Sequence, residues 1–397
     1  MKVPFVDLRS MHEEVRSEIE AAWRAIVDRS AFVGGPAVAD FERSFAAYCH
    51  APHAVGVSNG TDALRLALQA LGVRAGDLVV TVPHTFIATA EAITQLGASP
   101  AFVDIDPASY TMDPRLAERY LERECVVRNG TLVERRRDRP VTCLVPVDLY
   151  GHPADWEPLL ALARRYGLKV VEDACQAHGA RSGGRSCGTF GDAAAFSFYP
   201  GKNLGAMGEA GAITTASEEL AERCRVLRDH GQRERYIHVT AEGGNARLDA
   251  LQAVVLSVKL GRLERWNDAR RRVAAWYRAR LADETLVLPT ERSGSHHVYH
   301  LYVVQVPDRD ALRRQLEGSG VATGLHYPVP LHLQAAYAAL GHAVGDFPVS
   351  EAVAARGLSL PMFPHLTEEQ VDHVASALRS ALERTSEGSA VAPLARE

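Results

Sequence analysis

"VTCLVPVDLYGHPADWEPLLALARRYGLKVVEDA", residues 141–174, places two short apolar, partly β-branched runs on either side of a stretch with helical spacing. Such a strand–helix–strand unit joins two parallel strands of one sheet. The same alternation recurs from about residue 54 to residue 215. The sequence therefore predicts an α/β fold with a mainly parallel sheet flanked by helices, in which functional groups gather beyond the carboxyl ends of the strands.

The length of the chain predicts two domains. It has 397 residues, and single hydrophobic cores stop growing at about 250–300 residues. We expect a large α/β domain with an N-terminal arm over residues 1–250. Apolar positions at helical spacing predict one long helix over 247–283, which bridges into a small C-terminal α/β domain over 251–385. Residues 386–397 are expected to form a flexible tail.

Composition limits the partners and the compartment. The formal net charge is −5, and the acidic and basic residues are interspersed, which argues against nucleic acid or an anionic membrane as a partner. No apolar run approaches the roughly 18 residues of a membrane span, and the N-terminus has no signal-peptide core, so we expect a cytoplasmic protein. Six scattered cysteines without a C-x-x-C pair predict reduced thiols and no metal site.

One lysine stands out in "SFYPGKNLGAMGEAG", residues 197–211. Among 44 lysines and arginines only Lys2, Lys169, Lys202 and Lys259 are lysines. Arginine fills most basic positions, but a guanidinium cannot lose its proton and attack a carbonyl as an amine can. Composition therefore makes Lys202 a candidate nucleophile.

A phosphate site is predicted by two segments that follow strands. "SNGTDAL", residues 58–64, opens a helix at Gly60 and Thr61, whose backbone amides and hydroxyl suit a phosphate. Taken alone, the same pattern is more often a simple N-cap turn. Ser197 lies five residues before Lys202 and offers a further hydroxyl to the same site.

Three more side chains suit a flat heterocycle. Asp173 ends a buried strand, where a carboxylate can keep a pyridine nitrogen protonated. Gln176 follows three residues later and can reach a phenolic oxygen, and Phe86 can stack on a ring although such a residue is more often core. Together with the phosphate site and the rare lysine, these residues predict pyridoxal 5'-phosphate as the cofactor.

At this point the sequence resembles the sugar-nucleotide aminotransferases of the DegT type, which have the aspartate aminotransferase (fold type I) architecture. The resemblance covers residues 3–380. It rests on "PFVDL", "FVGGPAVADFE", "SNGTDAL", "TFIATAEAI", "DLYGHPAD", "VVEDACQAHGA", "FSFYPGKNLGAMGEAGAI", "RDHGQRERY", "GGNARLDALQAVVL" and "LHYPVPLHLQ".

The resemblance implies a seven-stranded sheet in the large domain and a homodimer with shared active sites. It assigns Lys202 to the covalent bond with the cofactor, Asp173 to its ring nitrogen and Gln176 to its phenolic oxygen. It assigns Phe86 to stacking on the ring and Asn245 to the partner subunit's phosphate. The phosphate is held by Gly60, Thr61 and Ser197, and the substrate pocket is shaped by His326, Tyr327 and His332.

The function that the resemblance implies is transfer of an amino group from L-glutamate to a nucleotide-linked keto-6-deoxysugar, with a dTDP-3-keto sugar favoured. A 4-keto sugar or an inosose-type cyclitol ketone are the alternatives within the enzyme class. A non-catalytic regulator that binds the cofactor is the alternative outside it, although the intact set of Lys202, Asp173 and Ser197 argues against a regulator.

The sequence departs from the family in the stretch "ERECVVRNGTLVERRRDRP", residues 122–140, which is longer and more basic than the usual link. It is either a surface excursion or a lid.

Overall fold

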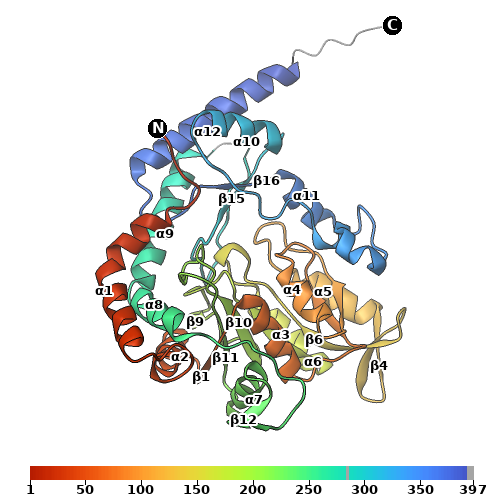
Figure 1. Cartoon of the computed structure of the whole chain (residues 1–397). Coiled ribbons are helices and arrows are strands. Elements are labelled where there is room, and N and C mark those ends of the chain that lie inside the picture. The colour runs from red at the N-terminus through yellow and green to blue at the C-terminus, as the bar shows by residue number, and fades with distance from the viewer. Residues whose placement is uncertain (283–285, 391–397) are drawn as a thin grey trace.

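The computed structural model describes residues 1–282 and 286–390 and places one large sheet below a smaller second core (Figure 1). The helices are α1 (Leu8–Asp28), α2 (Pro36–Cys49), α3 (Gly60–Ala70), α4 (Ala88–Thr94), α5 (Pro114–Arg123), η1 (Leu149–Gly151), α6 (Trp156–Tyr166), α7 (Glu218–Arg228), α8 (Ala250–Leu260), α9 (Leu263–Arg280), α10 (Arg309–Gly318), η2 (Leu331–Leu333), η3 (Ala335–Leu340), α11 (Pro348–Arg356) and α12 (Glu368–Ala390). The strands are β1 (His53–Val57), β2 (Leu78–Thr81), β3 (Ser99–Phe102), β4 (Cys125–Arg128), β5 (Thr131–Glu134), β6 (Arg139–Leu144), β7 (Lys169–Asp173), β8 (Arg181–Ser182), β9 (Arg185–Ser186), β10 (Ala193–Ser197), β11 (Gly211–Thr215), β12 (Gln232–Glu234), β13 (Ile237–His238), β14 (Ser295–His296), β15 (Tyr302–Gln305) and β16 (Gly357–Leu360).

The main sheet has the order β1-β11-β10-β7-β6-β2-β3. The neighbours among β10, β7, β6, β2 and β3 are parallel, whereas β11 is antiparallel to both β1 and β10. The predicted α/β fold with a mainly parallel seven-stranded path is confirmed, and a hairpin of β4 and β5 extends it to nine strands. Because the five strands run the same way, their carboxyl ends share one edge of the sheet.

Apolar residues cover both faces of this sheet, as expected for parallel strands. On one face, Leu64 and Leu68 of α3 pack with Val171 and Ile213 of the strands. On the other face lies a cluster that contains Phe41, Phe45, Trp156, Phe196 and Leu159. Burial of these side chains is the main force that holds the helices to the sheet.

The single long helix predicted over 247–283 is wrong, because the structure has two helices there. The Asp249 carboxylate caps α8 by accepting a hydrogen bond from the Gln252 amide at 2.7 Å. Gly261 and Arg262 separate α8 from α9, and residue 283 lies outside the described residues. The helix α9 carries Leu263 in the core of the sheet and Tyr277 in the second core, so it joins the two.

The second core combines the antiparallel pair β15–β16 with α9, α10 and α12 (Figure 1). The first residues of the chain also belong to it, because Val3 is buried there and pairs with Val321. The helix α12 continues to Ala390 and so extends into the tail predicted from residue 386; residues 391–397 lie outside the described residues. The domain limits themselves stay a prediction.

The basic stretch 122–140 forms the hairpin β4–β5 at the amino end of β6. Arg139 donates hydrogen bonds to the backbone oxygens of Gly76 and Asp77, at 2.6 and 3.1 Å. These contacts lie at the start of β2, on the edge of the sheet opposite to the carboxyl ends. Figure 1 shows β4 at the margin of the molecule, so the stretch is a surface excursion and the lid alternative is wrong.

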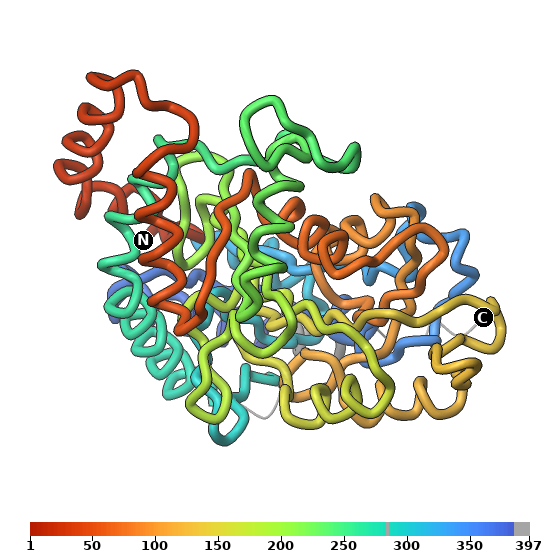
Figure 2. The backbone as a smooth tube through the Cα atoms, turned by 90° about the horizontal axis from the view of Figure 1, so that it is seen from below, coloured from red at the N-terminus to blue at the C-terminus, as the bar shows by residue number. Residues whose placement is uncertain are grey.

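The N-terminal helices flank the molecule on one side. Figure 2 shows α1 and α2 in red beside the teal α8 and α9, and α1 packs directly on α8. In the same view the green segment near residues 230–240, which contains β12 and β13, projects from the margin. Across the described part of the chain, none of the helices has the length and apolar character needed to cross a membrane.

Candidate active site

Asp173 is the last residue of β7 and lies buried at the carboxyl edge of the sheet, where the sequence places it. Its Oδ2 accepts a hydrogen bond from the Thr89 hydroxyl at 2.7 Å, and its Oδ1 accepts one from the Cys175 amide at 3.2 Å. Thr89 is itself bonded to the Thr85 hydroxyl at 2.9 Å. The carboxylate is therefore held from two sides in one orientation. Thr89 belongs to the quoted motif "TFIATAEAI", but only the fold shows that it contacts Asp173.

Gln176 is buried and connects three segments. Its Oε1 accepts the Tyr150 amide at 2.8 Å, and its Nε2 donates to the Tyr327 hydroxyl at 3.1 Å. The Tyr150 hydroxyl lies 2.7 Å from the His84 Nε2 and donates to the His326 carbonyl oxygen. These bonds place the predicted substrate residues His326 and Tyr327 beside Gln176, although they come from the far end of the chain.

Lys202 follows β10 in a loop that hydrogen bonds hold in place. Its amide donates to the Tyr199 carbonyl oxygen at 2.8 Å, and the buried Lys259 ammonium of α8 donates to the Gly205 carbonyl oxygen at 2.6 Å. Burial lowers the pKa of Lys202, while the nearby Cys175 and Asp173 oppose that shift. A lysine with a lowered pKa has a larger fraction of neutral, nucleophilic amine.

Three histidines surround this lysine and remain uncharged. Burial, followed by the charge of Lys202, lowers the pKa of His178 to about 3 and that of His326 to about 4. The same two causes hold the pKa of His300 well below its usual value. His300 reaches the Asn203 Oδ1 at 3.3 Å through its Nδ1. Neither His178 nor His300 carries a sequence signal of this role, because only the fold brings residues 178 and 300 next to residue 202.

Gly60 and Ser197 come together as the phosphate prediction requires. A Cβ atom on Gly60 would lie 2.6 Å from the Ser197 Cβ and 3.1 Å from its Oγ. Only glycine allows this approach between the N-terminus of α3 and the end of β10. Thr61 is the next residue of the same helix. A helix N-terminus and a hydroxyl this close together are suited to a phosphate dianion, and the assignment of Gly60, Thr61 and Ser197 to a phosphate stays a prediction.

Phe86 and Tyr327 line the exposed side of the site. Phe86 is 52% exposed, and its ring centroid lies 5.7 Å from that of Tyr327 at an interplanar angle of 41°. The ring of His326 stacks at 5.6 Å on Phe5, from the N-terminal segment "PFVDL". The structure therefore leaves Phe86 exposed beside Tyr327 and not in the core, and its stacking on a cofactor ring stays a prediction.

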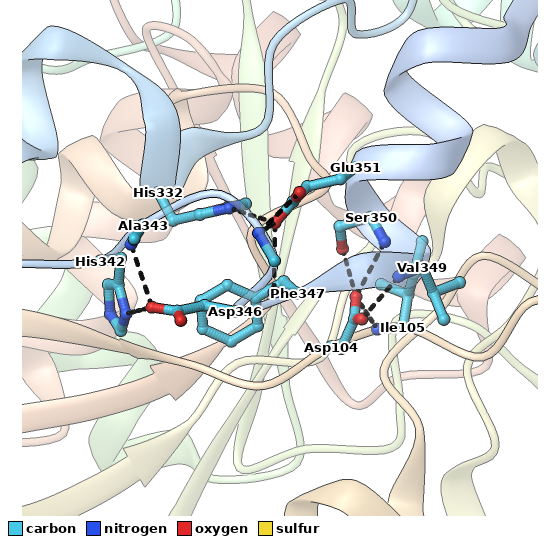
Figure 3. A network of polar contacts seen from close by, with 11 residues as sticks. Asp104, Ile105, His332, His342, Ala343, Asp346, Phe347, Val349, Ser350 and Glu351 are labelled. Carbon is cyan, nitrogen blue, oxygen red and sulfur yellow. Dashed lines mark hydrogen bonds and ion pairs between the residues drawn. The ribbon is translucent and has the colours of Figure 1, made fainter.

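His332 lies in a different polar network, drawn in Figure 3. It is buried, and its Nε2 donates to the Glu351 carboxylate at 3.0 Å. The same segment is fixed to the large sheet, since the Leu331 amide donates to the Pro83 carbonyl oxygen at 2.8 Å. Close by, the Asp104 carboxylate accepts the Ser350 amide at 2.9 Å at the start of α11. His332 thus fixes the segment that adjoins Phe86, and its contact with substrate stays a prediction.

Asn245 is exposed and forms a backbone bridge with Asp229. Its contact with a partner's phosphate stays a prediction.

The structure gathers Asp173, Gln176, Lys202 and the pair Gly60–Ser197 along one edge of the sheet. A buried carboxylate, a lysine of lowered pKa and a phosphate cradle at one edge suit a phosphorylated aromatic cofactor that activates an amine.

The chain matches the model of the DegT/DnrJ/EryC1/StrS aminotransferase family over residues 13–379. A relative from Saccharopolyspora erythraea, named erythromycin biosynthesis sensory transduction protein EryC1, is 45% identical over 96% of this chain and 100% of its own length. One from Streptomyces venezuelae, named dTDP-3-amino-3,4,6-trideoxy-alpha-D-glucose transaminase, is 44% identical over 97% of this chain and 98% of its own. The X-ray structure of S. venezuelae DesV with a ketimine intermediate is similar at a TM-score of 0.90 and 44% identity, over 96% of this chain and 99% of that one.

Proposed function

The chain belongs to the DegT/DnrJ/EryC1/StrS aminotransferase family, and we propose that it uses pyridoxal 5'-phosphate to transfer an amino group from L-glutamate to a nucleotide-linked 3-keto-6-deoxysugar. The observation that carries this proposal is the arrangement of Asp173, Lys202 and the Gly60–Ser197 contact at one edge of the sheet. When bound, the cofactor supplies an electron sink for the carbon that loses its proton.

The residues fit this cofactor. Ser197 and the first amides of α3, at Gly60 and Thr61, hold its phosphate, because a Cβ at Gly60 would close the cradle. Asp173 pairs with its ring nitrogen, since Thr89 and Cys175 hold the carboxylate oxygens in a fixed direction. Gln176 approaches its phenolic oxygen, and Phe86 stacks on its ring.

Lys202 performs the proton transfers. Its Nζ would accept the proton from the substrate carbon that carries the nitrogen and donate it to the carbon on the other side of that nitrogen. His178, His300 and His326 stay neutral beside it, so they add no positive charge that would further depress the pKa of the amine. They are positioned to shape the pocket, while Lys202 remains the group that accepts the proton.

The keto sugar is proposed from the similarity to the S. venezuelae transaminase. A dTDP-linked 3-keto sugar is favoured, with His326 and Tyr327 placed beside Gln176 to contact it. His332 is retained as a third substrate residue of this proposal. A 4-keto sugar and a cyclitol ketone are the outcomes that the experiment below separates from it.

The proposed assembly is a homodimer with shared sites. Several large apolar side chains are exposed in the link between α1 and α2, beside the site and on the projecting 230–240 segment, and a second subunit would cover them. They are Phe32, Val33, Phe86, Tyr199, Tyr236 and Ile237. Asn245 is exposed on the segment that follows, where it can reach the partner's phosphate.

The test adds amino sugars to purified protein loaded with the cofactor and follows its visible absorbance. We expect dTDP-3-amino-3,4,6-trideoxy-D-glucose to bleach the band and, with 2-oxoglutarate, to yield glutamate. The dTDP-4-amino isomer should leave it unchanged, and Lys202→Ala is the control that binds cofactor without turnover. Bleaching by the 4-amino isomer alone would move the reaction to C4, and bleaching by glutamate but by neither sugar would favour a cyclitol ketone. No bleaching by either sugar or by glutamate would favour a regulator, the role suggested by the name of the S. erythraea relative.

A further inference from the structure

Two buried carboxyl groups face each other behind the proposed active site. Glu172 precedes Asp173 on β7, and because side chains alternate along a strand it points to the opposite face of the sheet. There it meets Asp148, which follows β6. Both residues have no exposed surface. One oxygen of each carboxyl and the Cys187 sulfur all lie within 4.8 Å of one another.

The hydrogen bonds of this pair leave one oxygen without a donor. Glu172 accepts the Gly188 amide on Oε1 at 2.6 Å and the Phe190 amide on Oε2 at 3.0 Å. Asp148 accepts the Ala154 amide and the Trp156 indole on Oδ1, at 2.7 and 3.1 Å. Its Oδ2, the oxygen left over, is buried and has no donor with hydrogen-bond geometry among the described residues, although the Glu172 carboxyl and the Cys187 thiol lie close enough to interact with Asp148.

The side chains around Asp148 and Glu172 could not compensate the two negative charges that the pair would carry if both carboxyls were ionised. The indole of Trp156 stacks on Phe190 at 4.9 Å and seals the pair from water. No described lysine, arginine or histidine forms an ion pair with either carboxyl, and the titratable groups that face them are Cys187, Cys49 and Asp173. Two adjacent carboxylates in such a site cannot both ionise.

We propose that Asp148 and Glu172 share one proton, with the Glu172 carboxylic acid donating to the Asp148 Oδ2, and that this bond positions the edge carrying Asp173 and Gln176. Such a donor satisfies the only carboxyl oxygen left without one. Burial and then the charge of Asp148 hold the pKa of Glu172 well above its usual value, and burial raises that of Asp148 to about 6. The pair then carries a single negative charge.

The shared proton links three segments of the site. Asp148 holds the turn before α6, and Glu172 holds the turn that leads into β10 and Ser197. Two residues after Asp148, the Tyr150 amide donates to Gln176, and the Asp148 amide donates to the Asp173 carbonyl oxygen at 3.0 Å. Both residues are positioning residues, and this part of the inference rests on the proposed function.

A metal ion is the rival occupant of the same cluster. Glu172 already uses both oxygens on backbone amides, and Asp148 uses one, so a metal would find only the Asp148 Oδ2 and the Cys187 sulfur without such partners. Burial raises the pKa of Cys187, which disfavours the thiolate that metals bind. The donor set suits a proton better.

The test compares full-length wild type with three variants. In Asp148→Asn the amide nitrogen donates to an ionised Glu172, so every hydrogen bond is kept and the proton is lost. In Glu172→Gln the amide nitrogen cannot accept the Gly188 or Phe190 amide, so one buried donor is left unpaired. Asp148→Ala removes the partner altogether. The measurements are the infrared band of a protonated carboxylic acid, the pH dependence of unfolding, and cofactor affinity.

We expect the infrared band in wild type and its loss in Asp148→Asn. Unfolding of wild type releases the shared proton, because free carboxyls have pKa values near 4. Above about pH 6, where Asp148 has lost its own proton and the pair holds one, its unfolding equilibrium constant should therefore rise about tenfold per pH unit relative to Asp148→Asn, until the pH reaches the raised pKa of Glu172. Asp148→Asn should also bind cofactor at least about tenfold more tightly than Asp148→Ala, because it keeps the positioning bond, and a hydrogen bond from an amide to an ionised carboxylate is worth ~1.5 kcal/mol or more.

An unchanged band in Asp148→Asn, or parallel pH profiles, would overturn the shared proton. Metal in purified wild type that Asp148→Asn loses would assign the cluster to an ion instead. Equal cofactor affinity in Asp148→Asn and Asp148→Ala would overturn the positioning role. The first two readouts do not depend on transamination, so their failure is distinct from a failure of the proposed function. If Glu172→Gln does not fold, the two Asp148 variants still test both the shared proton and the positioning role.

Discussion

Gly60→Ala tests the phosphate cradle at its tightest point. The new Cβ would lie 2.6 Å from the Ser197 Cβ and 3.1 Å from both its Cα and its Oγ. Carbon atoms pack at about 3.5 Å or more, so the N-terminus of α3 and the end of β10 must separate by about 0.9 Å. The clash involves a Cα and cannot be relieved by a rotamer change alone.

Two free-energy effects follow from that separation. Overpacking of this kind costs about 1–3 kcal/mol in stability, offset by up to ~1 kcal/mol from the higher helix propensity of alanine. A charged hydrogen bond lost to the phosphate is worth about 1.5–3 kcal/mol, so the dissociation constant of the cofactor should rise about 10-fold to 100-fold. The effect on cofactor binding should therefore exceed the effect on the apoprotein.

The assay measures urea unfolding of the apoprotein and titrates pyridoxal 5'-phosphate by absorbance. Gly318→Ala is the matched control, since Gly318 lies in α10 with open space around it and the change should be neutral or stabilising. Combining Gly60→Ala with Ser197→Gly removes the clashing Cβ and should restore part of the stability. Combining it with Ser197→Ala keeps that Cβ and should restore none.

The reasoning is refuted if Gly60→Ala binds the cofactor as wild type does, because α3 would then not be part of the cradle. It is also refuted if Ser197→Gly and Ser197→Ala rescue stability equally, because the cost would then not arise from the Cβ contact.

Three further variants test the other parts of the site. Lys202→Ala should abolish turnover in a transamination assay, while a dialysed sample of the variant still retains cofactor. Lys169→Ala, which changes an exposed lysine, should behave as wild type in the same assay. Turnover in Lys202→Ala would exclude this lysine as the nucleophile. Thr89→Val removes the donor to the Asp173 Oδ2 and should lower kcat/KM about tenfold, the value of a charged hydrogen bond near 1.5 kcal/mol. Thr94→Val is the matched control, because Thr94 lies at the exposed end of the same helix, α4, and this change should alter kcat/KM less than twofold. Replacing Arg135 and Arg136 of the surface hairpin by serine should leave the KM for the sugar nucleotide within about twofold of the wild-type value at low and high salt. Both arginines lie at the edge of the sheet opposite to the proposed active site. A salt-dependent rise in KM would show that this segment contributes to substrate binding.

The sheet and its strand-end residues were predictable because each depends on local pattern. Alternation of strands and helices predicted a mainly parallel sheet, and the position of Asp173 follows from the end of β7 in "LKVVEDA". Gly60 and Ser197 were separate weak signals in the sequence. Their contact arises because Val57 and Ser197 pair with the same residue, Gly211, from its two sides. That pairing requires the antiparallel strand β11 between β1 and β10, which no local pattern specified.

The errors arose where local pattern gives no signal or the wrong one. Gly261 ends α8 with φ −64°, a helical value, so the break before α9 leaves the apolar spacing of 247–283 intact. Polar residues after residue 386 suggested a tail, yet α12 runs to Ala390. Tyr150 and His300 were missed because their role depends on contacts with His326 and Lys202, far away in sequence. Such contacts exist only after the two cores have packed.

The rarity of lysine pointed to Lys202 alone, but the structure gives a second lysine, Lys259, a role at the same loop, and the neighbours of the two lysines distinguish their roles. Lys2 and Lys169 are exposed, but Lys202 and Lys259 are both drawn into the protein around one loop. Lys259 donates to a backbone carbonyl oxygen, so its charge is used to hold the loop. Lys202 instead lies near Cys175 and Asp173 and among three neutral histidines. Burial lowers the pKa of both lysines, that of Lys259 to about 8. The Lys259 amine is bonded to a fixed backbone acceptor, whereas the Lys202 amine lies beside neutral side chains at the edge that carries Asp173, so the surroundings and not the residue type decide which lysine reacts.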